Sequence, residues 1–344
     1  MEATQKTRNV LLVGSVPLDN AEQVFRTAAS ILGPRLRRIP DGETGARLGW
    51  IGWQFEVFGS HPRFEVIPPT PGGYTTIPHV RLQSADRSAN LSFGALGYAA
   101  AARASWADFT RLQREGVIPA ASRFQVSLPT PLAPITSFVV LEDQPQVEAA
   151  YEARLLAELN EICAAIPPRR LAIQWDVAIE MAIWEGVWPA HFTDFKRGVV
   201  ERLARLGDHV PAGVELGYHL CYGDYGHQHF KQPADAANLV EVANALTAAV
   251  TRPIEWIHMP VPRERDDAAY FAPLRGLNRA PGTELYLGLV HFTDGLAGAR
   301  KRLIAAAGAI GDFGIATECG LGRRPPATIA ELFRLHAAIA DSSE

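Results

Sequence analysis

The sequence predicts a mixed α/β protein built as a single (β/α)8 barrel, or TIM barrel, with an elaborated N-terminal third. Strand-like and helix-like stretches alternate from about residue 120 to the end of the 344-residue chain. The strand-like stretches are short apolar runs, as expected of parallel strands buried on both faces. Polar residues follow many of these runs, and barrels carry their functional residues at the C-terminal ends of strands. An open doubly wound sheet would give the same alternation, but the number of units and the spread of polar residues favour the barrel.

Six strand–helix units follow from the apolar spacing in the last two thirds of the chain. Apolar residues recur with a period near 3.6 in the helical stretches. The strands are expected at 123–129, 170–178, 213–223, 253–261, 285–292 and 313–320. The helices are expected at 144–165, 192–206, 234–250, 268–274, 295–310 and 327–339.

The N-terminal third supplies the remaining units less regularly. NVLLVGSVP (9–17) predicts the first strand and 20–32 its helix. The region 38–120 is expected to hold insertions or lid elements, among them a Trp-rich helix at 48–58 and a helix at 98–115. One barrel strand must also lie there, either VRLQSA (80–85) or the segment around 90–93. No repeat or linker divides the chain, so residues 1–344 are expected to form one domain.

Composition narrows the class of protein. Hydrophobic residues make up 47% of the chain and the formal charge is -4, which disfavours a nucleic-acid partner because nucleic-acid binders usually carry a basic face. The N-terminal residues lack a secretory apolar region, and no run reaches membrane-spanning length. Three cysteines are too few for a disulfide scaffold. We therefore expect a cytoplasmic protein with no membrane association, and the sequence is compatible with a homo-oligomer.

Four residues in three segments have the chemistry of a tetrahedral zinc set. They are His219 and Cys221 in GYHLCYGD, Glu255 in PIEWIHMP, and Cys319 in ATECGLGRR. His219 and Cys221 stand two apart on a strand, so both side chains project to the same face. Two thiolates and a carboxylate give a bound Zn²⁺ a net negative charge, which suits activation of a thiol better than activation of water. The alternatives are cysteines that pack as small hydrophobes, as we expect for Cys163, and a structural zinc, which more often uses tight CxxC pairs.

These motifs resemble the catalytic barrel of cobalamin-independent methionine synthase, within the uroporphyrinogen decarboxylase/methionine synthase-like superfamily. The resemblance rests on HLC (219–221), IE (254–255), ECGL (318–321), VGSVP (13–17), QWD (174–176) and LPTPLAPITSF (128–138). It implies a zinc-dependent methyltransferase with His219, Cys221, Glu255 and Cys319 as zinc ligands. It also implies that the Gly-Ser segment at Ser15 and the carboxylate of Asp176 contact an amino-acid substrate. The Glu-Pro after the family's aspartate is absent here, and CGLGRR replaces the family's CGLKTR.

Further residues are candidates for catalysis or substrate binding. Asp176 and His291 end strands and are candidates for proton transfer, although a strand-end histidine can equally be a satisfied polar residue. Loop residues on the same face are candidates for substrate binding, although Asp41 could instead cap a helix. Tryptophans near strand ends hint at a flat or aromatic substrate. The predicted substrate-binding residues are Ser15, Asp41, Glu43, Arg47, Trp175, Tyr222 and Trp256.

Two reactions fit this set, and both use Zn²⁺ and small-molecule partners. The first is methyl or alkyl transfer to a thiol held by zinc as thiolate, from a folate, a methylated corrinoid protein or an aryl methyl ether. The second is a zinc-dependent lyase that cleaves an aromatic hydroxy compound and releases a small aldehyde. A non-catalytic zinc-stabilised barrel is the third and weakest alternative.

Overall fold

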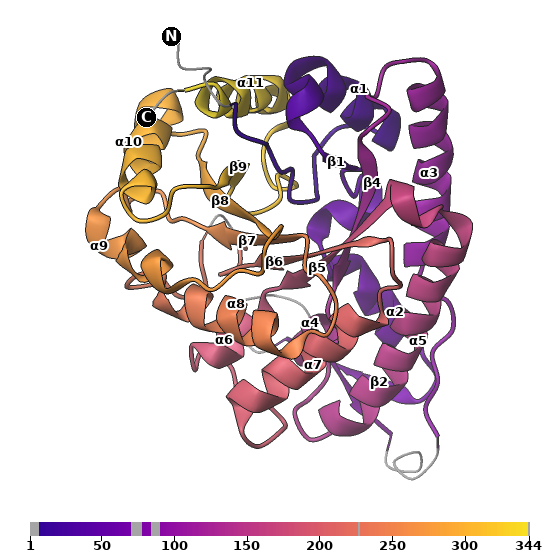
Figure 1. Cartoon of the computed structure of the whole chain (residues 1–344). Helices are drawn as coiled ribbons and strands as arrows, with labels where there is room; N and C mark the ends of the chain where they lie inside the picture. The colour runs from indigo at the N-terminus through magenta and orange to yellow at the C-terminus, as the bar shows by residue number, and fades with distance from the viewer. Residues whose placement is uncertain (1–6, 70–77, 84–89, 226–227, 343–344) are drawn as a thin grey trace, which may run out of the picture.

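A curled sheet of seven parallel strands organises the molecule in the computed structural model, which describes residues 7–69, 78–83, 90–225 and 228–342. The strand order is β1-β4-β5-β6-β7-β8-β9. The helices lie outside the curl (Figure 1). The strands are β1 (Arg38–Pro40), β4 (Arg123–Pro129), β5 (Leu171–Val177), β6 (Glu215–Leu220), β7 (Trp256–Pro260), β8 (Glu284–Val290) and β9 (Gly314–Thr317).

The helices form a layer in which helices close in sequence pack on each other. α3 contacts α5, α7 contacts α8, and α10 contacts α11. The first and last helices, α1 and α11, also contact each other, so the helix layer joins across the two ends of the chain. The helices are α1 (Ala21–Leu32), α2 (Phe55–Gly59), α3 (Tyr98–Arg114), α4 (Leu132–Phe138), α5 (Gln144–Ala165), α6 (Ile179–Trp184), α7 (Phe195–His209), α8 (Ala237–Ala249), α9 (Ala268–Phe271), α10 (Gly295–Ala307) and α11 (Ile329–Ala340). Along the described ranges, no helix combines the length and apolarity needed to cross a membrane.

The segment around Val10 lies between the first and last strands of the sheet. Val10 N donates to Arg35 O just before β1, and Leu11 N donates to Ile315 O in β9, each at 2.9 Å. The segment makes isolated bridges there rather than a regular strand. The carbonyl groups of Leu12 and Val13 accept hydrogen bonds from the side-chain amide of Gln125 instead of from a neighbouring strand. The parallel α/β sheet is thus confirmed, whereas the complete eight-stranded barrel is not.

The N-terminal third differs from the prediction. The strand hidden in this region is β1, whose three residues are too few to give an apolar pattern. The predicted segment 80–85 instead overlaps β3 (His79–Leu82), which pairs antiparallel with β2 (Phe64–Ile67) in a separate small sheet; residues 84–85 lie outside the described ranges. Residues 90–93 form no strand. The predicted helix 48–58 is divided into 3₁₀ turns and the short helix α2.

Candidate metal centre

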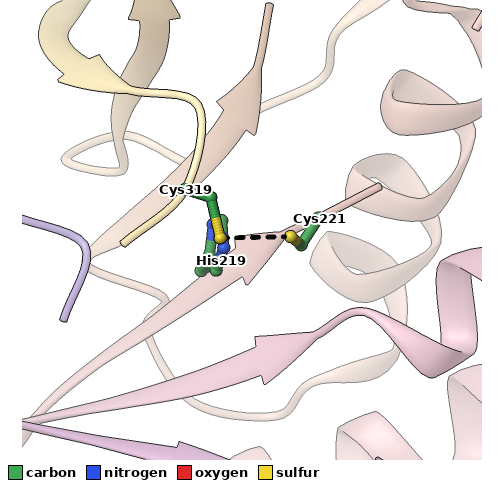
Figure 2. A group of neighbouring side chains, drawn as sticks. All are labelled: His219, Cys221 and Cys319. Atoms are coloured by element: carbon green, nitrogen blue, oxygen red, sulfur yellow. Dashed lines mark hydrogen bonds between the residues drawn. The ribbon is translucent and has the colours of Figure 1, made fainter. Parts of the chain in front are cut away.

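One imidazole and two sulfurs converge at the C-terminal edge of the sheet (Figure 2). His219 lies near the end of β6, Cys221 follows that strand directly, and Cys319 follows β9. The Cys221 and Cys319 Sγ atoms are 3.7 Å apart. The three ligand atoms all lie within 4.8 Å of one another, and both cysteines are free thiols.

This arrangement fits a tetrahedral zinc ion. Two sulfurs that each lie about 2.3 Å from zinc in tetrahedral geometry are about 3.8 Å apart, close to the separation found here. The buried His219 Nε2 has no hydrogen-bond partner in the described part of the chain, although buried polar atoms are nearly always paired. The neighbouring Cys221 sulfur and burial raise the pKa of the Cys319 thiol well above its usual range. A cation between the two sulfurs would remove this cost.

Close packing at two glycines positions the Cys319 segment. A Cβ atom at Gly288 of β8 would lie 2.6 Å from the Glu318 Cα, so only glycine permits this approach of β9 to β8. A Cβ atom at Gly320 would similarly meet the Ser15 hydroxyl at 2.4 Å. Ser15 also holds the segment by accepting the backbone N–H groups of Leu321 at its carbonyl and of Gly322 at its hydroxyl, at 2.7 and 3.1 Å.

Glu255, predicted as a fourth ligand at the C-terminal end of a strand, does not join the group and instead precedes its strand. β7 begins at Trp256, so Glu255 lies at the opposite, N-terminal edge of the sheet. Its carboxylate accepts the Leu216 backbone N–H at 2.6 Å and lies 3.7 Å from the Arg252 guanidinium. The predicted strand 253–261 is confirmed by β7, but at Glu255 the chain enters the sheet rather than leaving it.

A histidine that is not among the predicted site residues lies beside His219. His258 of β7 lies opposite His219 in the parallel register. Their Nδ1 atoms are 2.6 Å apart, and the His258 Nε2 lies 2.9 Å from the Thr317 carbonyl oxygen. Burial lowers the pKa of both imidazoles, to about 4 for His258, so both rings are neutral at physiological pH. Because His258 stands in the middle of the strand motif EWIHMP, no strand-end signal marked it.

Two carboxyl groups lie close to the candidate metal ligands. Asp176, near the end of β5, pairs in register with His219 and accepts a hydrogen bond from Gln174 Nε2 at 2.9 Å. Burial raises the pKa of Asp176 to about 7. Removal from bulk water and the nearby Asp176 raise the pKa of Glu43 well above its usual range. A Cβ atom at Gly14 would lie 2.3 Å from the Glu43 carboxylate, so this glycine makes room for it.

A cavity of about 370 Å³ joins the metal-ligand group to the carboxyl pair. Most of its remaining wall is apolar or aromatic. Glu43 and Trp50 enter the wall from left-handed backbone conformations with φ of 47° and 58°, which non-glycine residues rarely adopt. Such strain is common at functional sites. The wall contains Gly14, Ser15, Glu43, Leu48, Trp50, Ile51, His79, Asp176, Ile179, Trp188, His219, Cys221, Asp224, Tyr225, Phe230, Cys319 and Arg323.

Several predicted site residues have other partners and lie outside this wall as far as the described residues show. His291 Nε2 lies 2.8 Å from the Val261 carbonyl oxygen. The Tyr222 hydroxyl donates to Glu185 at 2.8 Å, and Trp175 is fully buried on β5. Three more predicted residues, Asp41, Arg47 and Trp256, contact other protein side chains. The Asp41 carboxylate accepts hydrogen bonds from Arg47 and from Ser105, each at 2.7 Å. The Trp256 ring centre lies 4.2 Å from the Arg38 guanidinium.

The fold and the site define a curled parallel α/β protein with a candidate metal centre at the C-terminal edge of its sheet. The same fold occurs in B12-independent methionine synthase-like proteins and in a methyltransferase. A Listeria monocytogenes structure, provisionally assigned as a vitamin-B12-independent methionine synthase, is 14% identical over 97% of each chain with a TM-score of 0.59.

Two further structures show the same likeness. A methyltransferase from Methanosarcina mazei is 13% identical over 99% of this chain and 95% of its own, with a TM-score of 0.56. A B12-independent methionine synthase from Shewanella sp. W3-18-1, in complex with selenomethionine, is 16% identical over 81% of this chain and 73% of its own, with a TM-score of 0.50. At these identities the likeness concerns the fold. No protein-family model and no curated protein matches the sequence.

Proposed function

We propose that this protein is a zinc-dependent methyl- or alkyltransferase that acts on a thiol. The observation that carries the proposal is the convergence of the His219 imidazole with two free sulfurs 3.7 Å apart, in the wall of a cavity at the C-terminal edge of the sheet. His219, Cys221 and Cys319 would hold the metal. The fold shared with methionine synthase-like proteins and a methyltransferase supports the same reaction class.

The ligand set suits an incoming thiol. Two thiolates and a neutral imidazole balance the charge of Zn²⁺, and three protein ligands leave a fourth position open, as in catalytic zinc sites. Zn²⁺ bound there would supply an electrophile that holds the substrate thiol in its deprotonated, nucleophilic form.

The protein's own residues would orient the thiol substrate. Glu43 and Asp176 form a carboxyl pair in the same wall as the metal ligands, and a cationic amine between them would relieve the cost of their burial. Ser15 would contact the same substrate from the N-terminal segment. A small aminothiol therefore fits this end of the cavity.

The apolar part of the wall would receive the methyl donor. Trp50, Trp188 and Phe230 provide flat surfaces, with the last two rings 5.4 Å apart. Apolar walls exclude water from the site, which protects the reactive methyl group from hydrolysis. Without substrate Asp176, with a pKa of about 7, titrates near neutral pH, and a cationic amine bound beside it would keep it in the carboxylate form that holds the amine.

Metal analysis of the purified protein tests the proposal. We expect about one zinc per chain, lost in Cys221→Ser and Cys319→Ser because each removes a thiolate ligand. Cys163→Ser is the matched control, since Cys163 lies on α5 and outside the ligand group. Full zinc content in both variants would exclude the ligand set. A screen of thiols with methyl donors, followed by mass spectrometry of the thiol product, then tests the reaction.

The lyase remains a second candidate because a titratable carboxyl group lies in a partly aromatic cavity. Asp176 would act as the proton carrier for cleavage of an aromatic hydroxy compound. Release of an aldehyde without any added thiol would favour the lyase. An alkylated thiol would favour the transferase.

A further inference from the structure

His258 links the two parts of the candidate metal centre. Its imidazole is fully buried between β6 and the end of β9. One ring nitrogen, Nδ1, lies 2.6 Å from the His219 Nδ1, and the other, Nε2, lies 2.9 Å from the Thr317 carbonyl oxygen. Thr317 stands two residues before Cys319, and its hydroxyl donates to the Cys319 carbonyl group at 2.8 Å. A single ring therefore contacts the strand of one ligand and the segment of another.

These contacts determine where the protons are. A carbonyl oxygen only accepts, so the His258 nitrogen that faces Thr317 must carry a hydrogen. A neutral imidazole has one N–H, and the His258 Nδ1 is therefore a bare acceptor. The adjacent His219 Nδ1 must donate to it. The remaining His219 nitrogen, Nε2, then carries a lone pair. It is the buried atom that has no hydrogen-bond partner among the described residues, and with Nδ1 occupied by His258 it is the nitrogen left to join the two sulfurs.

We propose that His258 is a positioning residue that holds His219 in the Nδ1–H tautomer with Nε2 ready to bind the metal. The inference rests on the metal centre of the proposed function. His258 stays outside the coordination sphere, because its Nδ1 is occupied by His219 and its Nε2 by Thr317. Metal-binding histidines generally donate their second N–H to such a partner, and loss of the partner typically weakens metal binding 10–100-fold.

Nuclear magnetic resonance of the metal-free, ¹⁵N-labelled protein tests the tautomers directly. We expect His219 to carry its hydrogen on Nδ1 and His258 on Nε2, and His258→Asn identifies the signals of residue 258. An Nε2–H tautomer at His219 would overturn the proposal. This measurement needs neither metal nor substrate, so its outcome is separate from that of the methyl-transfer assay.

Zinc affinity, measured by competition with a chelator, tests the consequence. His258→Leu removes the acceptor for His219 and is expected to weaken Zn²⁺ binding by about 10–100-fold. In His258→Asn the side-chain oxygen can take the place of Nδ1, so the affinity should recover to within a few-fold of wild type. Equal affinity in all three proteins would contradict the proposal.

X-ray absorption of the zinc-loaded wild type separates a positioning residue from a fourth ligand. We expect two sulfur ligands and one imidazole. Two imidazoles would place His258 in the coordination sphere and overturn the proposal, even if the leucine variant fails to fold.

Discussion

At the residue scale, the candidate site is arranged at a cost in stability. Asp176 and Glu43 are held away from bulk water near each other, and both have raised pKa values. A carboxyl group whose pKa is raised on folding favours the folded state only while it is protonated. Such a cost is expected where a ligand supplies the missing positive charge, because functional sites often sacrifice stability.

Replacing Asp176 by Asn should stabilise the protein at alkaline pH and not at acidic pH. The ordinary carboxyl pKa is 3.8 and that of folded Asp176 is about 7, so wild-type stability falls as pH rises between these values. The variant lacks this loss, and we expect a gain of up to about 4 kcal/mol at pH 8 that largely disappears near pH 4. Urea unfolding at both pH values measures it. An equal effect of the substitution at both would show that charge burial is not its cause.

Glu255→Gln should leave the zinc content unchanged. The residue lies at the opposite edge of the sheet from His219, where its carboxylate accepts the Leu216 N–H, and the Gln side chain keeps an acceptor there. The zinc content of Glu255→Gln is measured by metal analysis in parallel with that of Cys319→Ser, which is expected to lose the metal. Loss of zinc in Glu255→Gln would mean that the carboxylate reaches the metal after all.

Six of the predicted site residues are gathered by the structure in the cavity wall: His219, Cys221, Cys319, Asp176, Glu43 and Ser15. The sequence pattern did not show which residues of a strand face the cavity and which face away from it. Trp175 neighbours Asp176 on β5 but is not in the cavity wall, because successive side chains of a strand point to opposite faces. His258 could not be recognised, since its role depends on contacts with two other strands.

At the scale of elements, regular strands were predicted well and the irregular segment at the N-terminus was not. Strands β4 to β7 and β9 fall within the apolar runs predicted for them, and β8 begins one residue before its run, because each of these strands is buried and hydrogen-bonded on both sides. The segment 9–13 is equally apolar, yet its carbonyl groups accept hydrogen bonds from the side-chain amides of Gln125 and Gln174 in place of a strand ladder. Apolar pattern alone does not reveal such side-chain partners.

Gln125→Leu should therefore loosen the N-terminal segment. The change removes two buried hydrogen bonds to the Leu12 and Val13 carbonyl groups, each at 3.1 Å, and should lower the free energy of unfolding by about 1–3 kcal/mol. We expect faster hydrogen exchange at the Val10 and Leu11 amides. Gln144→Leu is the control, because that amide binds the Val139 carbonyl group far from this segment. Unchanged exchange in Gln125→Leu would show that the backbone bridges hold the segment by themselves.

At the scale of the whole molecule, the curl of the sheet brings its first strand against its later ones. Arg38 of β1 is buried and lies within salt-bridge distance of Glu215 on β6 and Glu284 on β8, at 2.5 and 2.7 Å. Its guanidinium also lies 4.2 Å from the centre of the Trp256 ring on β7. One side chain thus crosses the interior at the N-terminal edge, opposite the cavity, and ties together strands that are far apart in the sheet order.

Arg38→Met should destabilise the protein strongly without affecting zinc binding. Removing one partner of a buried ion pair leaves uncompensated charge and typically costs 3–5 kcal/mol. Because Glu215 keeps Arg123 and Glu284 keeps Arg37, we expect about 3 kcal/mol by urea unfolding. Arg37→Met is the matched control: Arg37 pairs with the same Glu284, but its side chain is 58% exposed, so its loss should cost under about 1 kcal/mol. Similar costs for the two variants would mean that Arg38 does not hold the curled sheet together across its interior.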